Sequence, residues 1–383
     1  MQFKKELLLS SLFIGIFFTL TPYSNAKIEC KNIYGNLAGE TPADDELCQG
    51  IIYNEIPGRA FPNGSIIKKK NYPQVYYIEN FQKRAIESPA LFESRNFDWN
   101  ALIISSEWDV DLMQLSYDST NTFIGEDGAP LTFRDGSLLS NRGGVYIISD
   151  GLRRPIVSPA AFLRLGFKWN NVKAVSDAEL NLHPLGEAVT TTSNYPDGVV
   201  IKTGGGKMYL VDDDKRRYIP SPLVFDSLFK WNETVDLSLA VAPVYNPSEK
   251  GDVIIRDGVL ISGEGKVWVT ESGKKIPIYS PEIFESLGLS WGQVKPASTF
   301  DMNNIPTNNS SDLGKNIRVF ADGTALKSDS SSQIYYSKAG ILRPINTPER
   351  FYSRYQNFNQ VITVPKRLID KYPIGSELPP SPY

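Results

Sequence analysis

The sequence predicts a mainly β repeat protein in which each unit carries one short helix. Three observations lead to this prediction. An aromatic strand motif occurs five times, and an Asn-Gly or Asp-Gly dipeptide precedes each copy. Twelve residues after each central aromatic stands a Ser-Pro or Thr-Pro dipeptide, beginning at Ser88, Ser158, Ser221, Ser280 and Thr347. Side chains shared by all five copies are therefore expected to build the unit.

Residues 1–26 are typical of a secretory signal peptide. A basic start precedes an apolar run from Leu7 to Leu20, and small residues at 24–26 suit a cleavage site. An uncleaved membrane anchor is the alternative, but the run is short for a span of about 20 residues. We expect a secreted, periplasmic or cell-surface protein without a transmembrane segment once the signal is removed.

Two cysteines follow this segment, Cys30 and Cys48. In an exported chain such a pair usually forms a disulfide, and free thiols are the alternative. A loop of this size stabilises by roughly 3 kcal/mol in the chain-entropy model. We expect 27–61 to be an N-terminal cap with this disulfide. A metal site is not expected with so few soft ligands, and no cofactor is predicted.

The formal net charge is −3 at pH 7. This value is too near neutral to indicate nucleic acid or an anionic membrane as the main partner. Frequent aromatics, 29 glycines and 26 prolines fit β structure that is rich in turns.

Each unit is expected to open with a glycine turn that leads into a strand, because Asn-Gly and Asp-Gly supply a positive φ. The aromatic strand follows. A polar turn such as 149–151 then leads into a third strand, which carries Arg154-Pro155-Ile156 or Arg343-Pro344-Ile345. Prolines there place the third strand at an edge or near a strand end.

The Ser-Pro or Thr-Pro dipeptide predicts the start of a short helix, since Ser or Thr caps it and proline needs no donor there. Gly166, Gly288 and Asn96 suit a left-handed helix end. A phenylalanine recurs on the helix at Phe92, Phe162, Phe225, Phe284 and Phe351. An aromatic closes each unit at Trp99, Trp169, Trp231, Trp291 and Phe358. We expect these two sets to be buried, and a fourth strand to follow.

Five tandem repeats are thus predicted within 62–378, at 62–133, 134–195, 196–255, 256–320 and 321–378. One unit cannot bury enough apolar area alone, but stacked neighbours can. The regular strands favour a five-bladed β-propeller. An open repeat array is the alternative.

The pattern Asp-Gly-x-Leu-Ile, Val-Tyr-Leu-Val, Lys-Arg-Arg-x-Ile, Ser-Pro-x-x-Phe-x-x-Leu-Gly-x-x-Trp-x-x-Val resembles a tandem repeat of secreted and surface bacterial proteins. Residues 134–175 and 256–294 carry it most clearly, and 62–102 and 321–364 more loosely. The resemblance implies a repeat architecture and no particular activity. The alternation of short strands is also similar to hemopexin-type propeller blades.

The sequence offers few candidates for acid–base chemistry. The one histidine, His183, lies in a connector and is expected at the surface, so a Ser-His-Asp triad is not predicted. Glu107, Asp109 and Asp111 would share one face of a strand, as a glycosidase pair or cation site needs, although a solvated connector fits better. The runs 212–214 and 204–206 are expected to be ordinary turns, since no Gly-Lys-Ser/Thr opens a helix after the glycines. No catalytic residue is predicted.

Basic residues recur on the third strand, and Arg84, Arg154, Arg217 and Arg343 are the predicted binding residues. Arginine holds carboxylates and phosphates through paired hydrogen bonds. The alternative is that each arginine pairs with a nearby acid or covers an aromatic face.

These observations predict an exported, non-enzymatic binding or scaffolding protein of the cell envelope, whose partner is a glycan or a protein. The alternatives are an exported carboxylate-dependent polysaccharide hydrolase and a purely structural surface array. An acidic cleft would favour the hydrolase, a groove with exposed aromatics would favour glycan binding, and a flat polar surface would favour the structural role.

Overall fold

The computed structural model describes residues 61–111, 127–237, 251–311 and 313–379. The predicted signal peptide, Cys30, Cys48 and nearly all of the predicted cap lie outside these residues. None of the helices in the described ranges is long and apolar enough to cross a membrane.

Five four-stranded sheets make up the described part of the chain, which is the predicted mainly β repeat. The first strands are β1 (Ile66–Lys69), β5 (Leu138–Asn141), β9 (Val200–Lys202), β13 (Leu260–Gly263) and β17 (Ala325–Ser328). The second strands are β2 (Val75–Glu79), β6 (Gly144–Ser149), β10 (Met208–Asp212), β14 (Lys266–Glu271) and β18 (Ile334–Lys338). The third strands are β3 (Gln82–Ile86), β7 (Leu152–Pro155), β11 (Lys215–Ile219), β15 (Lys274–Ile278) and β19 (Ile341–Ile345). The fourth strands are β4 (Leu102–Ser105), β8 (Lys173–Ala174), β12 (Val235–Asp236), β16 (Lys295–Pro296) and β20 (Ile362–Val364).

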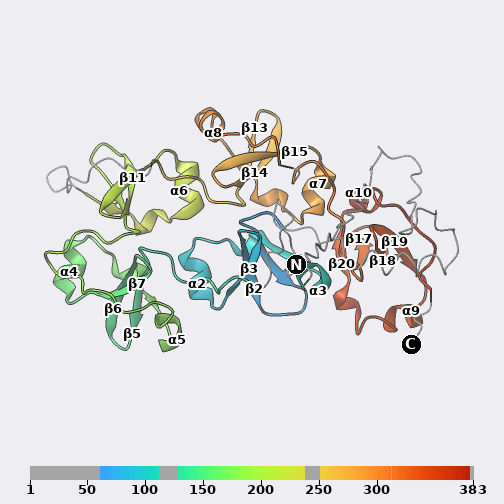
Figure 1. Cartoon of the computed structure of the whole chain (residues 1–383), viewed down its shortest axis with the longest axis horizontal. Helices are drawn as coiled ribbons and strands as arrows, with labels where there is room; N and C mark the ends of the chain where they lie inside the picture. The colour runs from blue at the N-terminus through green and yellow to red at the C-terminus, as the bar shows by residue number, and fades with distance from the viewer. Residues whose placement is uncertain (1–60, 112–126, 238–250, 312, 380–383) are drawn as a thin grey trace, which may run out of the picture. The chain divides into compact units, whose positions relative to one another are not determined.

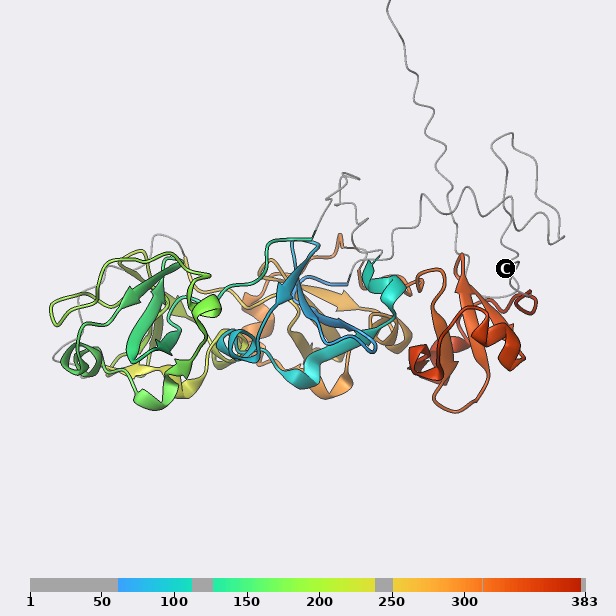
Figure 2. The same cartoon turned by 90° about the horizontal axis from the view of Figure 1, so that it is seen from below.

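All five sheets have the same strand order, third, second, first, fourth. The first three strands are antiparallel, whereas the fourth returns beside the first and runs parallel to it. The register is also constant. In each sheet the central aromatic of the second strand pairs with the second residue of the first strand, as in Ile67 with Tyr76 and Ile261 with Trp268. Figure 1 shows β5, β6 and β7 side by side, and Figure 2 shows the same green sheet from below.

The helices begin where the dipeptides predict. They are α2 (Pro89–Ser94), α4 (Pro159–Arg164), α6 (Pro222–Leu228), α7 (Pro281–Ser286) and α9 (Pro348–Tyr352). In each one the Ser or Thr side chain accepts a hydrogen bond from the backbone N–H three residues later. Gly166, Gly288 and Asn96 have φ values of 71°, 73° and 53°, as the left-handed helix end requires.

Further helical segments come before and after the fourth strand in the chain. The 3₁₀ turns are η1 (Trp99–Ala101), η3 (Trp169–Asn171), η4 (Trp231–Glu233), η5 (Trp291–Gln293) and η6 (Phe358–Gln360). Helices after the fourth strand are α3 (Glu107–Asp111), α5 (Asp177–Leu180), α8 (Thr299–Asn304) and α10 (Lys366–Ile369). This second set was not among the predicted elements, although the N-caps Ser176, Ser298 and Pro365 each follow the closing aromatic at the same spacing.

The recurring aromatics differ in burial, and the prediction for the closing set is wrong. The helix phenylalanines are at most 1% exposed, as expected, but the closing aromatics are 45–55% exposed. Each closing ring lies over its phenylalanine, with ring centroids 3.7 to 4.4 Å apart. One face of the closing ring packs on the core and the rest meets solvent, because the 3₁₀ turn that carries it runs along the surface of the unit.

The third strand is the edge of the four-stranded order, where its prolines are tolerated. The connector that follows each unit then pairs with this strand. Leu131 N–H donates to Ala85 O at 2.9 Å, and Val253 N–H donates to Tyr218 O at 2.8 Å. The connector therefore covers backbone groups that an open edge would leave unpaired.

The first and fourth units dock through their glycine turns, and so do the second and third. A Cβ at Gly64 would lie 2.0 Å from Asp257 O, and one at Gly136 would lie 2.2 Å from Gly198 O. Only glycine allows this approach. The five sheets fit a repeat array, and no closed propeller is found among the described residues. In each sheet the fourth strand lies beside the first and parallel to it, instead of extending an antiparallel meander.

Candidate binding groove between the first and fifth units

The acidic cluster after the first unit does not form the predicted strand face. Glu107, Asp109 and Asp111 lie on helix α3, which buries Asp109 of the three. Asp109 is buried and forms an ion pair at 2.7 Å with Arg318, which lies in the segment that leads into the fifth unit. Asp111 pairs with Lys69. Only Glu107 of the three lines a groove.

His183 is buried, so the prediction of a surface connector is wrong. Its exposed fraction is 2%. Nε2 accepts a hydrogen bond from Phe133 N–H at 3.2 Å, which leaves Nδ1–H to donate to Gly151 O at 2.8 Å. Burial lowers the pKa of this imidazole, although the hydrogen bond to Gly151 opposes the shift. Through these two hydrogen bonds, His183 links its connector to Phe133 at the end of the first unit and to the Gly151 turn of the second.

The four predicted arginines contact the connector that covers their own sheet. Arg84 Nε donates to Ala129 O at 2.8 Å and Arg154 Nε donates to Glu187 O at 3.0 Å. Arg217 contacts Gly251 O and Asp252 O, and Arg343 donates to Ser376 Oγ. Arg84 and Arg217 also form ion pairs with Glu79 and Asp212. A role in binding a ligand stays a prediction.

The remaining polar runs are turns. Asp213 and Asp214 have positive φ and connect β10 to β11, and Asp197 accepts a hydrogen bond from Asp213 N–H at 2.8 Å. Gly205 and Gly206 lie in the hairpin before β10. Within the described ranges no group of three or more His, Cys, Asp or Glu side chains is placed to hold a metal ion.

A groove of about 370 Å³ lies between the first and fifth units. Two exposed aromatics line it, Tyr72 at 47% and Trp108 at 41% exposure. The rest of its lining is mostly polar and rich in amides, comprising Lys70, Asn71, Ser106, Glu107, Ala325, Tyr355, Gln356, Asn357, Asn359 and Gln360. Aromatic faces and orientable amides thus share one concave surface.

Glu107 organises the polar side of the groove. Its carboxylate accepts hydrogen bonds from the Tyr72 hydroxyl at 3.1 Å and from Gln360 Nε2 at 3.3 Å. The bond to Glu107 raises the pKa of Tyr72. Gln360 Oε1 in turn accepts from Gln356 N–H at 2.7 Å. The network joins side chains of the two units along one wall of the groove.

Trp108 is placed by the glycine turn of the fifth unit. A Cβ at Gly323 would lie 3.1 Å from Trp108 Nε1, so the indole packs on the glycine turn of the fifth unit. In the first four units, each glycine turn packs instead on the glycine turn of another unit. Sequence reasoning missed Trp108 and Tyr72. The available signal was that Trp108 stands outside the repeat pattern, whereas Trp99 and its counterparts recur.

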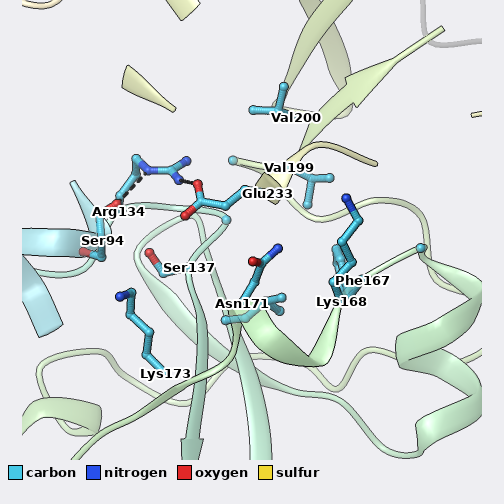
Figure 3. Close-up of a pocket in the computed structure, with 14 residues that line it drawn as sticks. Ser94, Arg134, Ser137, Phe167, Lys168, Asn171, Lys173, Val199, Val200 and Glu233 are labelled. Atoms are coloured by element: carbon cyan, nitrogen blue, oxygen red, sulfur yellow. Dashed lines mark hydrogen bonds and ion pairs between the residues drawn. The ribbon is translucent and has the colours of Figure 1, made fainter. Parts of the chain in front are cut away.

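A second hollow, between the second and third units, is much smaller. Its volume is about 30 Å³, and Figure 3 shows Arg134 and Glu233 joined across it. Their ion pair measures 2.7 Å. This hollow leaves no room for a ligand of the size of a sugar.

No family model and no functionally curated protein matches the chain. Among solved structures, the chain is similar at 15% identity to a chain of the periplasmic assembly from the ESX-5 inner membrane complex, with a TM-score of 0.15. The match covers 86% of this chain and 93% of the other. An intact ESX-5 inner membrane complex matches at 15% identity and a TM-score of 0.14, covering 88% and 84%. TM-scores this low carry no argument about fold or function.

Proposed function

We propose that this chain is an exported, non-enzymatic repeat protein that binds a glycan of the cell envelope in the groove between its first and fifth units. One observation carries the proposal, namely that Tyr72 and Trp108 expose their rings in a groove lined by amide side chains. Export rests on the N-terminal sequence, and closure of the repeats into a propeller is a further proposal.

The chemistry of the groove suits a sugar. The C–H faces of a sugar ring pack on aromatic faces, which lose little conformational entropy on binding. Sugar hydroxyls donate and accept hydrogen bonds, and amides such as Asn71 and Gln356 do both. A concave site with convergent polar groups is the usual setting for such ligands.

The hydrolase alternative is less well supported. Hydrolysis of a glycosidic bond by the common route uses two carboxyl groups that flank the bond. The groove lining contains one carboxylate, Glu107, and Asp109 behind it is engaged with Arg318. A purely structural array would not need exposed aromatics in a groove.

The recurring arginines enter the proposal as a second, anionic contact surface. Arg84, Arg154 and Arg217 donate hydrogen bonds to carbonyl oxygens of the connectors, but their side chains remain partly exposed to solvent. The triple change of Arg154, Arg217 and Arg343 to Gln should weaken binding of an acidic glycan while the fold persists. Unfolding of the triple variant would assign these arginines a structural role alone.

The groove is tested with chitohexaose and cellohexaose as neutral probes in calorimetric titrations of the mature chain. Trp108→Ala should weaken binding about tenfold, because a good packing contact of this kind contributes about 1.4 kcal/mol. Tyr279→Ala is the matched control, since Tyr279 is 56% exposed and lies outside the groove. Equal affinity of the Trp108 variant and the wild type, or no binding of either probe, would reject the proposal.

A further inference from the structure

The first and fourth units form the same kind of pair as the second and third, since the same contacts recur at corresponding residues. A Cβ at Gly166 of the second unit would lie 2.8 Å from Val235 Cγ1 of the third. A Cβ at Gly288 of the fourth unit would lie 2.6 Å from Ile103 Cγ2 of the first. Val235 and Ile103 each stand four residues after the closing tryptophan. The second unit therefore corresponds to the fourth, and the third to the first.

An arginine precedes the glycine turn at corresponding places in the two pairs. Arg134 comes directly before Asp135-Gly136, and Arg256 comes directly before Asp257-Gly258. Arg134 lies over the Phe229 ring of the third unit, 4.9 Å from its centroid. Arg256 lies over the Phe97 ring of the first unit at 5.1 Å. Each phenylalanine stands two residues before the closing tryptophan, so the two guanidinium groups occupy equivalent positions.

Their charge partners differ. Arg134 pairs with Glu233, the third residue of η4, at 2.7 Å, and it also donates to Ser94 O at 3.1 Å (Figure 3). The third residue of η1, in the same position, is Ala101. Arg256 donates through Nη1 to two backbone carbonyls, those of Arg95 and Asn96, at 3.0 and 3.1 Å.

Arg256 forms no ion pair with any residue in the described ranges. Burial lowers the pKa of both guanidinium groups. At Arg134 the carboxylates of Glu233 and Asp135 oppose that shift, whereas at Arg256 the opposing group among the described residues is the Tyr77 hydroxyl. Arg256 stays protonated, as arginine does in proteins, so its positive charge has no carboxylate partner there.

The missing carboxylate leaves space. The hollow beside Arg134 measures about 30 Å³, whereas the cavity lined by Arg256 and Ala101 measures about 420 Å³. Trp99, with 47% of its surface exposed, forms part of the wall. The larger cavity thus combines an unpaired cation with an aromatic surface.

Three other charged side chains line this cavity, Asp98, Asp226 and Lys295. Asp98 accepts from the backbone and side-chain nitrogens of Asn100 at 2.9 and 3.0 Å. Asp226 accepts from Trp231 Nε1 at 2.7 Å. Neither carboxylate forms an ion pair with Arg256, and neither contributes to its pKa shift.

We propose that the cavity between the first and fourth units binds the carboxylate of a sugar acid, which takes the place beside Arg256 that Glu233 takes beside Arg134. The sugar ring packs on Trp99. This inference rests on the proposed glycan function, but it assigns a second site, and the ligand of that site carries a negative charge that pairs with Arg256. The paired N–H groups of arginine match a carboxylate in geometry as well as charge.

The decisive variant supplies the carboxylate from the chain itself. In calorimetric titrations with trigalacturonic acid, Ala101→Glu should weaken binding about tenfold, since a hydrogen bond to a charged group contributes about 1.5–3 kcal/mol. Its melting temperature should stay level or rise, because the new side chain fills the cavity and pairs with Arg256. The methyl ester of the probe should bind the wild type about tenfold more weakly than the acid, for the same reason.

Asn171→Glu is the matched control, because it adds the same charge at the equivalent residue of the second unit. It should bind the acid like the wild type. Acid binding that survives in Ala101→Glu, an ester that binds as well as the acid, or a wild type that does not bind the acid would overturn the inference. Loss of acid binding in Trp108→Ala but not in Ala101→Glu would place the acid in the other groove and overturn this inference alone, leaving the proposed function in place.

Discussion

The carboxylate of Asp109 lies 2.7 Å from the guanidinium of Arg318, and the two side chains are 0% and 2% exposed. Asp109 also accepts hydrogen bonds from Ser105 Oγ at 2.7 Å and from Ala321 N–H at 3.0 Å. Arg318 lies over the Phe61 ring, 4.0 Å from its centroid. The ion pair with Arg318 and the hydrogen bond from Ala321 therefore join the helix that carries Glu107 and Trp108 to the start of the fifth unit.

Asp109→Asn should lower the free energy of unfolding by roughly 3–5 kcal/mol, because it leaves the Arg318 charge buried without a partner. Chemical denaturation measures the change. Asp111→Asn is the control, since its pair with Lys69 is partly exposed to solvent and contributes about 0–1 kcal/mol. Equal denaturation midpoints for the two variants would contradict the structural role of the buried pair.

Stability should fall as the pH drops below about 6.5, the ordinary pKa of histidine, because burial lowers the pKa of His183. In that range the unfolded chain binds a proton that the folded chain excludes. The folded chain keeps the imidazole neutral, because Nε2 accepts a hydrogen bond from Phe133 N–H and can do so only without a proton of its own. Above about pH 6.5 both states are neutral at this residue, and its contribution is constant.

Denaturation at pH 5 and pH 7.5 measures this effect. His183→Gln keeps one acceptor and one donor but has no proton to gain, so its loss of stability between the two pH values should be smaller than that of the wild type. A loss of the same size in both proteins would mean that other groups cause the pH dependence.

Phe284→Ala should destabilise by roughly 3–5 kcal/mol, as expected for a fully buried aromatic. Trp291→Ala should cost less, about 1–3 kcal/mol, because only one face of the indole packs, on Phe284 at a centroid distance of 4.0 Å. The two free energies of unfolding are compared directly. An equal cost would show that the exposed face of Trp291 is covered in the native protein.

Gly323→Ala should weaken binding of chitohexaose, because a Cβ there would lie 3.1 Å from Trp108 Nε1 and displace the indole from the groove wall. Its φ of 89° adds backbone strain of about 1–2 kcal/mol. Gly143→Ala is the control, with a φ of 82° and open space around the new Cβ. Both variants should lose stability, and only Gly323→Ala should lose affinity. Unchanged affinity would separate Trp108 from the binding site.

The unit itself could be predicted because its signals are local. Ser158 caps a helix through an N–H three residues away, and Gly166 ends that helix through its own φ. Such contacts depend on spacing along the chain, which the five copies repeat. The candidate groove could not be predicted in this way, since Tyr72 and Trp108 recur in no other unit and come together with Gln360 only through folding.

By itself, the sequence determined the turns, the helix starts, the constant register of the hairpins and the burial of residues such as Phe284. Tertiary structure alone decided that the fourth strand returns beside the first, that His183 is buried, and that the Trp291 ring is half exposed. It also decided which units meet, as in the contact between Asp109 and Ala321, 212 residues apart. The physical reason is that similar repeats present similar surfaces to one another. Which units pair therefore depends on residues that differ between the repeats, such as Ala101 and Glu233. It also depends on contacts between residues far apart in the chain, which the repeat pattern does not specify.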